Sequence, residues 1–253
     1  MRLAGKVAVI SETQAGIGRA TALRFAEEGA AVVCVDADRE EAEETARQIE
    51  AAGGTAVAVQ ADVTTAAGCE AVAATAVARC GGVDVLYNNT ATIVMGTVEQ
   101  TSEEDWERIF AVNVKAAFLL SRACIPLMRA RGGGSIVNLA SSLAFIGYAG
   151  LPAYTATKGA LRMLSKTMAL DHAHERIRVN CVCHGGVDDP LLNSLFAATP
   201  DPAAALARFL ETIPAGRLAT LLDMANAALF LACDESAATT GTELLVDGGQ
   251  TAR

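Results

Sequence analysis

A tyrosine and a lysine four residues apart, Tyr154 and Lys158 in the stretch YTATK, carry the clearest chemical signal in the sequence. Residues at this spacing share one face of a helix, so the two side chains can meet. A lysine cation beside a phenol favours the phenolate, which otherwise forms only at about pH 10. A phenol made more acidic can act as a general base toward an alcohol or as a general acid toward a ketone. Taken alone, the pair also fits one face of an ordinary amphipathic helix.

A glycine turn near the N-terminus has the pattern of a phosphate-binding loop. Gly16, Ile17 and Gly18 follow an apolar run and open a helix, where backbone N–H groups can meet a pyrophosphate. Glu12, however, stands where a first glycine is expected. A carboxylate about 4 Å from a pyrophosphate costs about 1 to 4 kcal/mol of binding free energy, but much less if it points into solvent. We therefore expect a weakened dinucleotide site rather than a lost one.

An acidic residue after the next apolar run bears on which dinucleotide binds. Asp36 lies 18 residues after Gly18, where a carboxylate can take both ribose hydroxyls of an adenosine. It would also repel a 2′-phosphate, and no Lys or Arg stands at Ala15 or Ala37 to attract one. These residues favour NAD over NADP. The alternative for Asp36 is an ordinary helix cap.

The elements that must position these groups alternate along the chain. Apolar, β-branched runs recur as KVAVI, AAVVCV, TAVAVQ, VDVLYNN, GSIVNLA, IRVNCVC and TELLVDGG. Near-continuous apolar runs are typical of strands that are buried on both faces. The segments between them have helix signals, with Asp38 as one expected cap and Ser102 with Asp105 as another. The alternation predicts a parallel, doubly wound sheet with right-handed crossovers.

One segment interrupts this alternation. Residues 188–218 are long, punctuated by proline and apolar in patches. We expect a substrate lid over the carboxyl ends of the strands, where such sheets place their ligands. The chain is otherwise expected to form a single domain, residues 1–253, without repeats or linkers.

Together these motifs resemble the short-chain dehydrogenase/reductase family over nearly the whole chain. Besides YTATK, the match includes NLAS ending at Ser141, the pair Asn88–Asn89, FAVNV containing Asn113, and TELLVDGG near the C-terminus. The resemblance implies a Rossmann-type doubly wound parallel sheet of about seven strands with helices on both faces. It also implies hydride transfer between a nicotinamide and a carbonyl or alcohol.

The resemblance also implies roles for individual residues. Tyr154 would be the acid/base, Lys158 would bind the nicotinamide ribose, Ser141 would hold the substrate oxygen, and Asn113 would anchor a water that relays the proton. Asp62–Val63 would meet the adenine, although Asp62 also fits a plain strand-end turn. The full set of implied cofactor contacts is Gln14, Gly16, Ile17, Gly18, Asp36, Asp62, Val63, Asn89, Ala91, Tyr154, Lys158, Val187 and Asp189.

Four positions depart from the family pattern along the cofactor's expected path. Glu12 replaces a glycine, Thr90–Ala91 replaces Ala-Gly, His184–Gly185 replaces Pro-Gly, and Asp189 replaces a threonine. Either the protein no longer needs to bind its cofactor tightly, or the site's preference among cofactor forms has changed. If Asp189 and its neighbour face the nicotinamide, they should favour NAD⁺ over NADH by about 0.5 to 1.5 kcal/mol. The alternative is an exposed acidic loop that never faces the ring.

His184 lies near the same site and would titrate near neutral pH if its pKa were ordinary. It is either part of the loop's structure or a substrate contact. With Cys181 and Cys183 it also offers soft metal-ligand types, but a metal site needs a further ligand. Strand alternation places both cysteines on one buried face, so we expect packing there and no metal.

The charge and composition of the whole chain limit what kind of partner it can have. A formal net charge of −9 argues against nucleic acid, and the N-terminal apolar run is too short for a signal core or a membrane span. Seven scattered cysteines, an odd number, indicate reduced thiols in a cytoplasmic protein. By analogy with the family, two long apolar helices suggest a homotetramer.

The substrate side is mostly apolar and contains no cluster of Arg or Lys, which favours a hydrophobic secondary alcohol or its ketone over a phosphate or CoA ester. Many of these residues also fit core or subunit contacts. We expect an NAD(H)-dependent alcohol dehydrogenase/ketone reductase. The alternative is a non-catalytic binding protein of the same fold, which the intact catalytic set disfavours. The candidate pocket residues are Ile93, Val94, Met95, Leu143, Phe145, Tyr148, Leu191, Leu192, Leu195 and Phe196.

Overall fold

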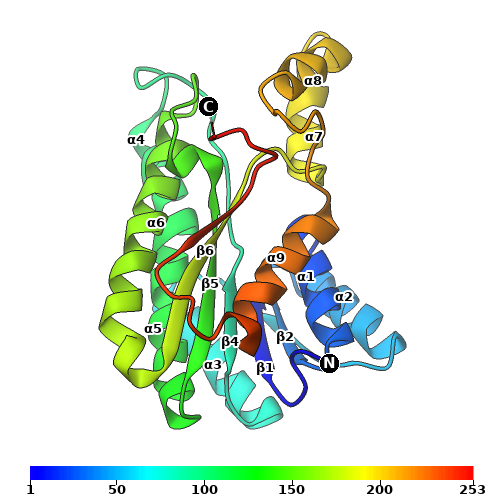
Figure 1. The fold of residues 1–253 in the computed structure, drawn as a ribbon, viewed down its shortest axis with the longest axis vertical. Helices are drawn as coiled ribbons and strands as arrows, with labels where there is room; N and C mark the ends of the chain where they lie inside the picture. Colours follow the sequence, from blue (N-terminus) through cyan, green and yellow to red (C-terminus); the bar gives the residue numbers. More distant parts are fainter. Residues whose placement is uncertain (253) are drawn as a thin grey trace.

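The computed structural model describes residues 1–252 and contains one parallel sheet of seven strands in the order β3-β2-β1-β4-β5-β6-β7 (Figure 1). The predicted doubly wound, Rossmann-type sheet is therefore confirmed. The strands are β1 (Val7–Ser11), β2 (Ala31–Asp36), β3 (Thr55–Gln60), β4 (Val85–Asn88), β5 (Gly134–Ser141), β6 (Ile177–His184) and β7 (Glu243–Val246).

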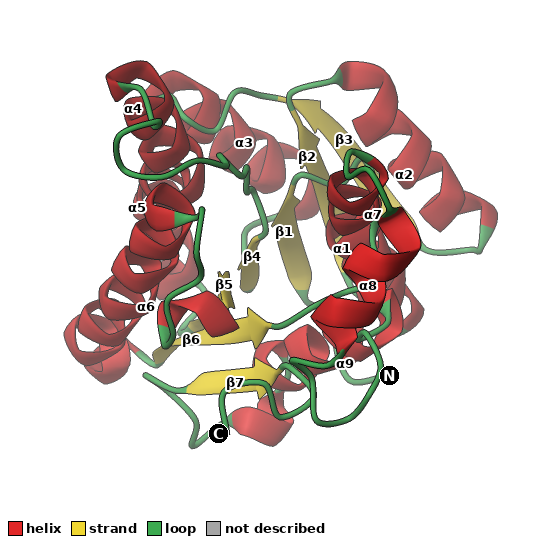
Figure 2. Cartoon of the chain, turned by 90° about the horizontal axis from the view of Figure 1, so that it is seen from above, coloured by secondary structure: helices red, strands yellow, loops and turns green. Residues whose placement is uncertain are grey.

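Helices cover both faces of this sheet (Figures 1 and 2). They are α1 (Gly16–Glu27), α2 (Arg39–Ala51), α3 (Ala66–Cys80), α4 (Glu103–Phe110), α5 (Ala116–Ala130), α6 (Pro152–His172), α7 (Pro190–Ala197), α8 (Pro202–Leu210) and α9 (Leu221–Ala232). Short 3₁₀ or π turns are η1 (Ala111–Lys115), η2 (Ser142–Ala144), η3 (Ala173–Glu175) and η4 (Asp234–Ser236).

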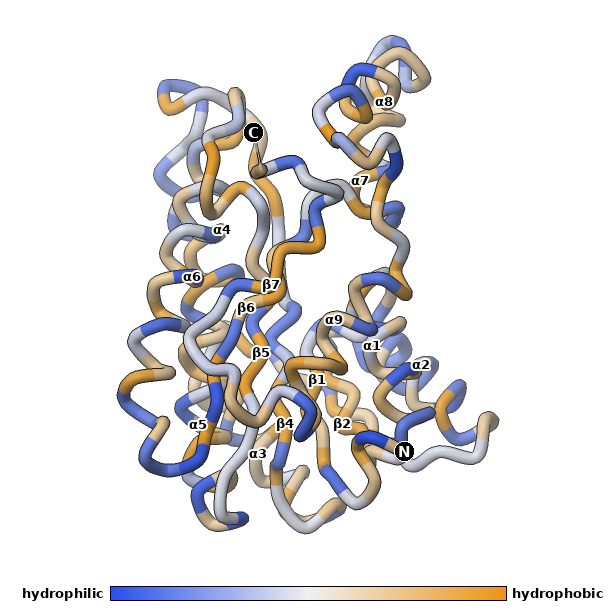
Figure 3. The backbone as a smooth tube through the Cα atoms, viewed as in Figure 1, coloured by the Kyte–Doolittle hydropathy of each residue, from blue (hydrophilic) through white to orange (hydrophobic). Residues whose placement is uncertain are grey.

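Alternate strand residues enter two separate cores, which is why the strands read as continuous apolar runs. Ile10 of β1 packs in one core with Phe25 of α1 and Leu229 of α9. Its neighbour Val9 packs in the other core with Leu120 of α5. Each such buried side chain contributes about 1.5 to 3 kcal/mol. The tube of Figure 3 is accordingly mostly apolar along the central strands.

The expected helix starts are present. The Asp38 side chain accepts a hydrogen bond from Glu40 N, and Ser102 Oγ accepts one from Asp105 N. The helix that follows Ser102 is not uniform, because the π turn η1 separates α4 from α5. Residues 188–218 contain α7 and α8, which stand at the end of the molecule where the C-terminus lies (Figure 1).

One helical run, Glu103–Ala130, is long and apolar enough to cross a membrane by length and composition alone. Half of its most apolar window is buried inside the structure. A core helix of a soluble protein passes the same test, so this run is weak support for a membrane span.

Candidate active site

The Tyr-Lys pair and the serine of NLAS meet at the carboxyl end of the sheet. Tyr154 and Lys158 are buried on α6, and Ser141 ends β5. The register of the parallel strands places Ser141 opposite His184, the last residue of β6. Ser141 Oγ donates to the His184 carbonyl at 3.3 Å, and Tyr154 Oη lies 3.3 Å from His184 Nε2.

Lys158 does not make the tyrosine acidic in this structure. Its Nζ donates to the Leu139 carbonyl at 2.8 Å and lies 5.4 Å from the centroid of the Tyr154 ring. Burial raises the pKa of Tyr154 above its usual value, contact with Ser141 lowers it, and the Asp189 charge raises it. Burial also lowers the pKa of Lys158 to about 8, against the opposing effect of Glu12. The expectation of a phenol acidified by Lys158 is therefore wrong for the protein alone, because desolvation of the phenolate dominates.

Asn113 lies in the π turn η1, and its side chain is fully engaged by the protein. Its Oδ1 accepts from Thr92 N at 2.7 Å, and its Nδ2 donates to the Thr92 carbonyl and to Thr157 Oγ1. The amide thus ties the segment after β4 to α6. A water relay anchored at Asn113 remains a prediction.

A cavity of about 400 Å³ opens beside Tyr154, Ser141 and His184. Eight of the ten predicted pocket residues line it; Val94 and Phe145 do not. Val94 is buried in a core cluster with Ile109, and the Phe145 ring lies 4.2 Å from the Arg162 guanidinium. The lining residues that the sequence did not indicate include Thr199, Ala205, Arg208, Phe209, Thr212 and Gln250. Most of them lie on α8 or next to it, and only the fold brings them to the pocket.

Glu12 turns inward, so the solvent-facing alternative is wrong. It has a φ of 56°, and within residues 1–252 only Arg176 is another non-glycine residue with positive φ. Its Oε2 accepts a hydrogen bond from Ala91 N at 2.6 Å. Burial raises the pKa of Glu12 to about 7, the Ala91 N–H lowers it, and the Asp36 charge raises it. An ionisable acid therefore lies between the ends of β1 and β4.

The glycine turn otherwise fits a dinucleotide. A Cβ on Gly18 would lie 1.9 Å from the Glu12 carbonyl oxygen, so only glycine lets α1 start this close to β1. Gly16 has a φ of 55°, which glycine adopts readily. Two buried oxygens beside the turn, Thr13 Oγ1 and Asn89 Oδ1, have no hydrogen-bond partner among the described residues. Such unpaired acceptors suit the hydroxyls of a bound ribose.

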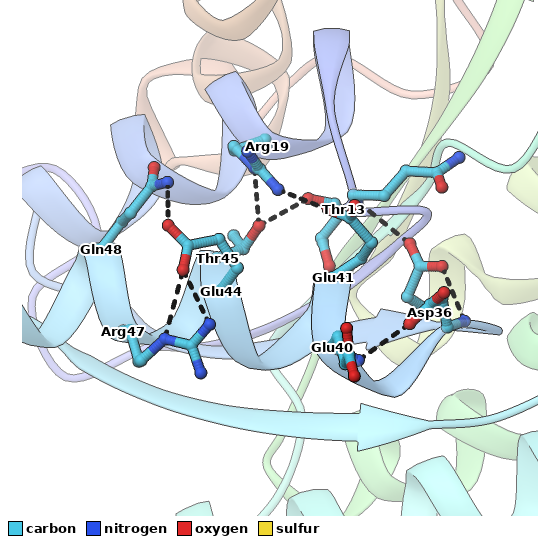
Figure 4. A network of polar contacts seen from close by, with 11 residues as sticks. Thr13, Arg19, Asp36, Glu40, Glu41, Glu44, Thr45, Arg47 and Gln48 are labelled. Carbon is cyan, nitrogen blue, oxygen red and sulfur yellow. Dashed lines mark hydrogen bonds and ion pairs between the residues drawn. The ribbon is translucent and has the colours of Figure 1, made fainter.

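The Asp36 carboxylate is held in place by backbone N–H groups. Gln14 N donates to its Oδ2 at 3.0 Å and Asp38 N to its Oδ1 at 3.1 Å. Asp38, rather than Asp36, caps α2, so the cap alternative for Asp36 is wrong. Figure 4 shows the guanidinium of Arg19 turned to the Thr45 hydroxyl and the Glu41 carboxylate. This cation is therefore already paired.

The remaining predicted contacts lie around the same edge. Asp62 is exposed, and its Oδ1 accepts from Thr64, as the strand-end turn interpretation requires. Val63 and Val187 are buried. Asp189 caps α7 by accepting from Leu192 N, and its Oδ2 would lie 3.9 Å from a Cβ placed on Gly16. The carboxylate thus lies over the glycine turn, and Asp189 also lines the cavity beside Tyr154. Its expected effect on the nicotinamide stays a prediction.

His184 does not titrate near neutral pH, contrary to the sequence-based expectation. Burial lowers its pKa to about 4, with a further contribution from the Lys158 charge. Cys181 and Cys183 pack with Ala140, so the expected packing is observed. In residues 1–252, no group of three or more His, Cys, Asp or Glu side chains is arranged to hold a metal ion.

Comparisons with known proteins support the fold and identify the family. Residues 12–251 match the family model described as Enoyl-(Acyl carrier protein) reductase. The 2,5-dichloro-2,5-cyclohexadiene-1,4-diol dehydrogenase of Sphingobium indicum is 42% identical over 248 residues, which cover 98% of this chain and 97% of that protein.

Solved structures also match over nearly the whole chain. A Burkholderia xenovorans protein described as a short-chain dehydrogenase/reductase superposes with a TM-score of 0.96 at 38% identity, over 100% of this chain and 98% of that one. A 7α-hydroxysteroid dehydrogenase, solved with NADH and 7-oxo glycochenodeoxycholic acid, gives a TM-score of 0.93 at 33% identity, over 98% of this chain and 95% of that one.

Fold and site together define an oxidoreductase of the dinucleotide-binding class, with a buried Tyr-Lys pair beside an apolar pocket. The chain belongs to the short-chain dehydrogenase/reductase family.

Proposed function

We propose that this protein is an NAD(H)-dependent oxidoreductase that interconverts a hydrophobic secondary alcohol and its ketone. The observation that carries the proposal is the position of Tyr154 Oη at the apolar cavity, with Ser141 lining the same cavity. A phenol and a serine hydroxyl around one substrate oxygen supply an acid/base and a hydrogen-bonding partner.

Each residue of the site has its own role in this proposal. Tyr154 Oη gives a proton to a ketone oxygen or takes one from an alcohol. Ser141 Oγ, which now donates to the His184 carbonyl, turns its hydrogen bond toward the substrate oxygen. Lys158 holds the nicotinamide ribose and adds positive charge, which offsets the desolvation that disfavours the phenolate. A nicotinamide bound at this edge supplies or accepts the hydride.

NAD is the proposed cofactor because Asp36 ends β2 with its carboxylate fixed by two backbone N–H groups. A 2′-phosphate at that place would meet like charge. The guanidinium of Arg19 is engaged with Glu41. Gln14, Gly16, Ile17, Gly18, Asp62, Val63, Asn89, Ala91, Val187 and Asp189 are proposed to line the rest of the cofactor's path.

The substrate class follows from the cavity. More than half of the residues that line it are aliphatic, methionine, tyrosine or phenylalanine. Arg208 is the one Lys or Arg that lines it among the described residues, which argues against a multiply charged substrate. The proposal that residues 188–218 act as a lid rests on Leu191, Leu195 and Phe209, which lie in that segment and line the cavity.

Tyr154→Phe tests the catalytic assignment. Turnover of a hydrophobic alcohol panel with NAD⁺, followed by NADH formation, should fall by about 10²- to 10⁴-fold, while NAD⁺ binding stays largely intact. Tyr87→Phe is the matched control, since Tyr87 is a core tyrosine on β4 outside the cavity. Equal turnover in the wild type and Tyr154→Phe would remove Tyr154 from the mechanism.

A second candidate function is a non-catalytic binding protein of this fold. The observation in its favour is Glu12, whose partly buried carboxylate lies at the start of the glycine turn, where it accepts a hydrogen bond from Ala91 N. An absence of turnover in the wild type, together with weak binding of every nicotinamide dinucleotide, would select this candidate.

We further propose a cytoplasmic homotetramer. The seven cysteines are free, as in a reducing compartment. Phe118 on α5 and Met163 on α6 are exposed apolar side chains on two long helices, and a twin subunit would bury them. Light scattering of the purified protein measures the mass directly, and a monomer would refute the assembly.

A further inference from the structure

The imidazole of His184 lines the cavity, and the proposed reaction leaves it without a role. His184 ends β6, and strand register sets it opposite Ser141. Its Nε2 lies 3.3 Å from Tyr154 Oη, the atom proposed to carry the proton.

The second ring nitrogen determines the direction of that hydrogen bond. His184 Nδ1 lies 2.7 Å from the carbonyl oxygen of Gly185. A carbonyl oxygen only accepts, so Nδ1 carries the ring hydrogen. In a neutral ring Nε2 is then a lone-pair acceptor, and Tyr154 must be the donor across the 3.3 Å contact.

The charged groups that face this pair come from several elements. Burial, followed by the Lys158 charge on α6, lowers the pKa of His184 to about 4 against the opposing effect of the Gly185 carbonyl, so the ring stays neutral. Asp189, before α7, faces Tyr154, and Glu12, after β1, faces Lys158. Cys183 of β6 also lies near Lys158. Its contact with Cys181, followed by burial, raises the pKa of this thiol, so it is neutral.

We propose that His184 is a positioning residue for Tyr154: its Nε2 accepts the phenolic hydrogen and holds Tyr154 protonated and aimed into the cavity. An imidazole with its hydrogen on Nδ1 has nothing to donate from Nε2 to a phenolate. It therefore stabilises the phenol and disfavours the phenolate. This inference rests on the proposed function, since it assigns His184 an effect on the acid/base.

This hydrogen bond favours one direction of the proposed reaction over the other. At neutral pH, Tyr154 is better prepared to give a proton to a ketone than to take one from an alcohol. Removing the acceptor should make the phenolate about three- to tenfold easier to form, the range expected for one ordinary hydrogen bond. Alcohol oxidation, which needs the phenolate, should then extend to lower pH.

The first test reads the ring directly, without cofactor or substrate. Nitrogen-15 NMR of histidine-labelled protein resolves three histidines, and the resonances of His184 are those that shift in Tyr154→Phe. We expect a neutral ring with its hydrogen on Nδ1 throughout about pH 5 to 8. Because the unmodified protein is measured, the result does not depend on whether a His184 variant folds.

The second test is the pH profile of kcat/KM for alcohol oxidation. In His184→Phe the acidic limb should move down by about half to one pH unit. Cys183→Ala is the matched control, because Cys183 is adjacent on β6 but packs against Ala140 and Cys181. Its acidic limb should stay where it is in the wild type.

A hydrogen on Nε2, a ring that titrates in that window, or no response to Tyr154→Phe would overturn the inference. An acidic limb that stays or moves up in His184→Phe would do the same. These results in an active enzyme leave the proposed function standing. Absence of turnover in the wild type overturns the proposed function and the inference together.

Discussion

Replacing Glu12 by glycine should stabilise the protein, and more so as the pH rises. The pKa of Glu12 is raised from 4.5 to about 7, with burial as the largest cause. Its contribution to stability is therefore complete below pH 4.5 and is lost as the pH rises through about 7. The difference corresponds to about 3 kcal/mol. Glycine also relieves the backbone strain of a side chain at φ 56°, which stabilises the protein by about 1 kcal/mol. Loss of the hydrogen bond to Ala91 N destabilises it by a similar amount, so these two effects offset each other.

Urea unfolding of the wild type and Glu12→Gly measures this gain. We expect about 3 kcal/mol at about pH 8 and nearly none at about pH 4.5. Glu12→Gln removes the charge but keeps the Cβ, so it should reproduce the pH-dependent part of the gain in the free energy of unfolding. Arg176→Gly, at φ 59° on the exposed surface, isolates the relief of backbone strain. A gain for Glu12→Gly that is equal at both pH values would refute the reasoning.

Other substitutions test other parts of the site. Gly18→Ala places a Cβ 1.9 Å from the Glu12 carbonyl oxygen and should lower the free energy of unfolding by at least about 2 kcal/mol; Gly147→Ala, with open space around its Cβ, should change it little. Asp36→Asn should tighten NADP⁺ relative to NAD⁺ by about tenfold in calorimetry, and an unchanged ratio would mean that Asp36 does not select the cofactor. Asp189→Thr keeps a capping hydroxyl on α7 while removing charge. It should reduce any preference for NAD⁺ over NADH, and identical dissociation constants before and after the change would exclude that effect.

The sheet was predictable because its strands are buried on both faces and so leave continuous apolar runs in the sequence. The register between those strands leaves no such pattern. Ser141 and His184 are 43 residues apart, yet they are opposite partners in β5 and β6. The contact between His184 and Tyr154 follows from that register and could not be inferred from the sequence.

The site was predictable where spacing along one element determines geometry, as with Tyr154 and Lys158 on α6. It was not predictable where burial and long-range contacts determine the pKa or the orientation of a side chain. Desolvation, rather than Lys158, controls the pKa of Tyr154 in the protein alone. Glu12 faces inward because an N–H of the segment after β4 meets its carboxylate, a long-range contact that a local motif does not encode.

Calorimetric titration of the wild type with NAD⁺, NADH and NADP⁺ tests the central claim most directly. We expect saturable binding of NAD⁺ and NADH well below about 1 mM, and binding of NADP⁺ that is at least about tenfold weaker. Binding of none of the three at about 1 mM, or a preference for NADP⁺, would contradict it.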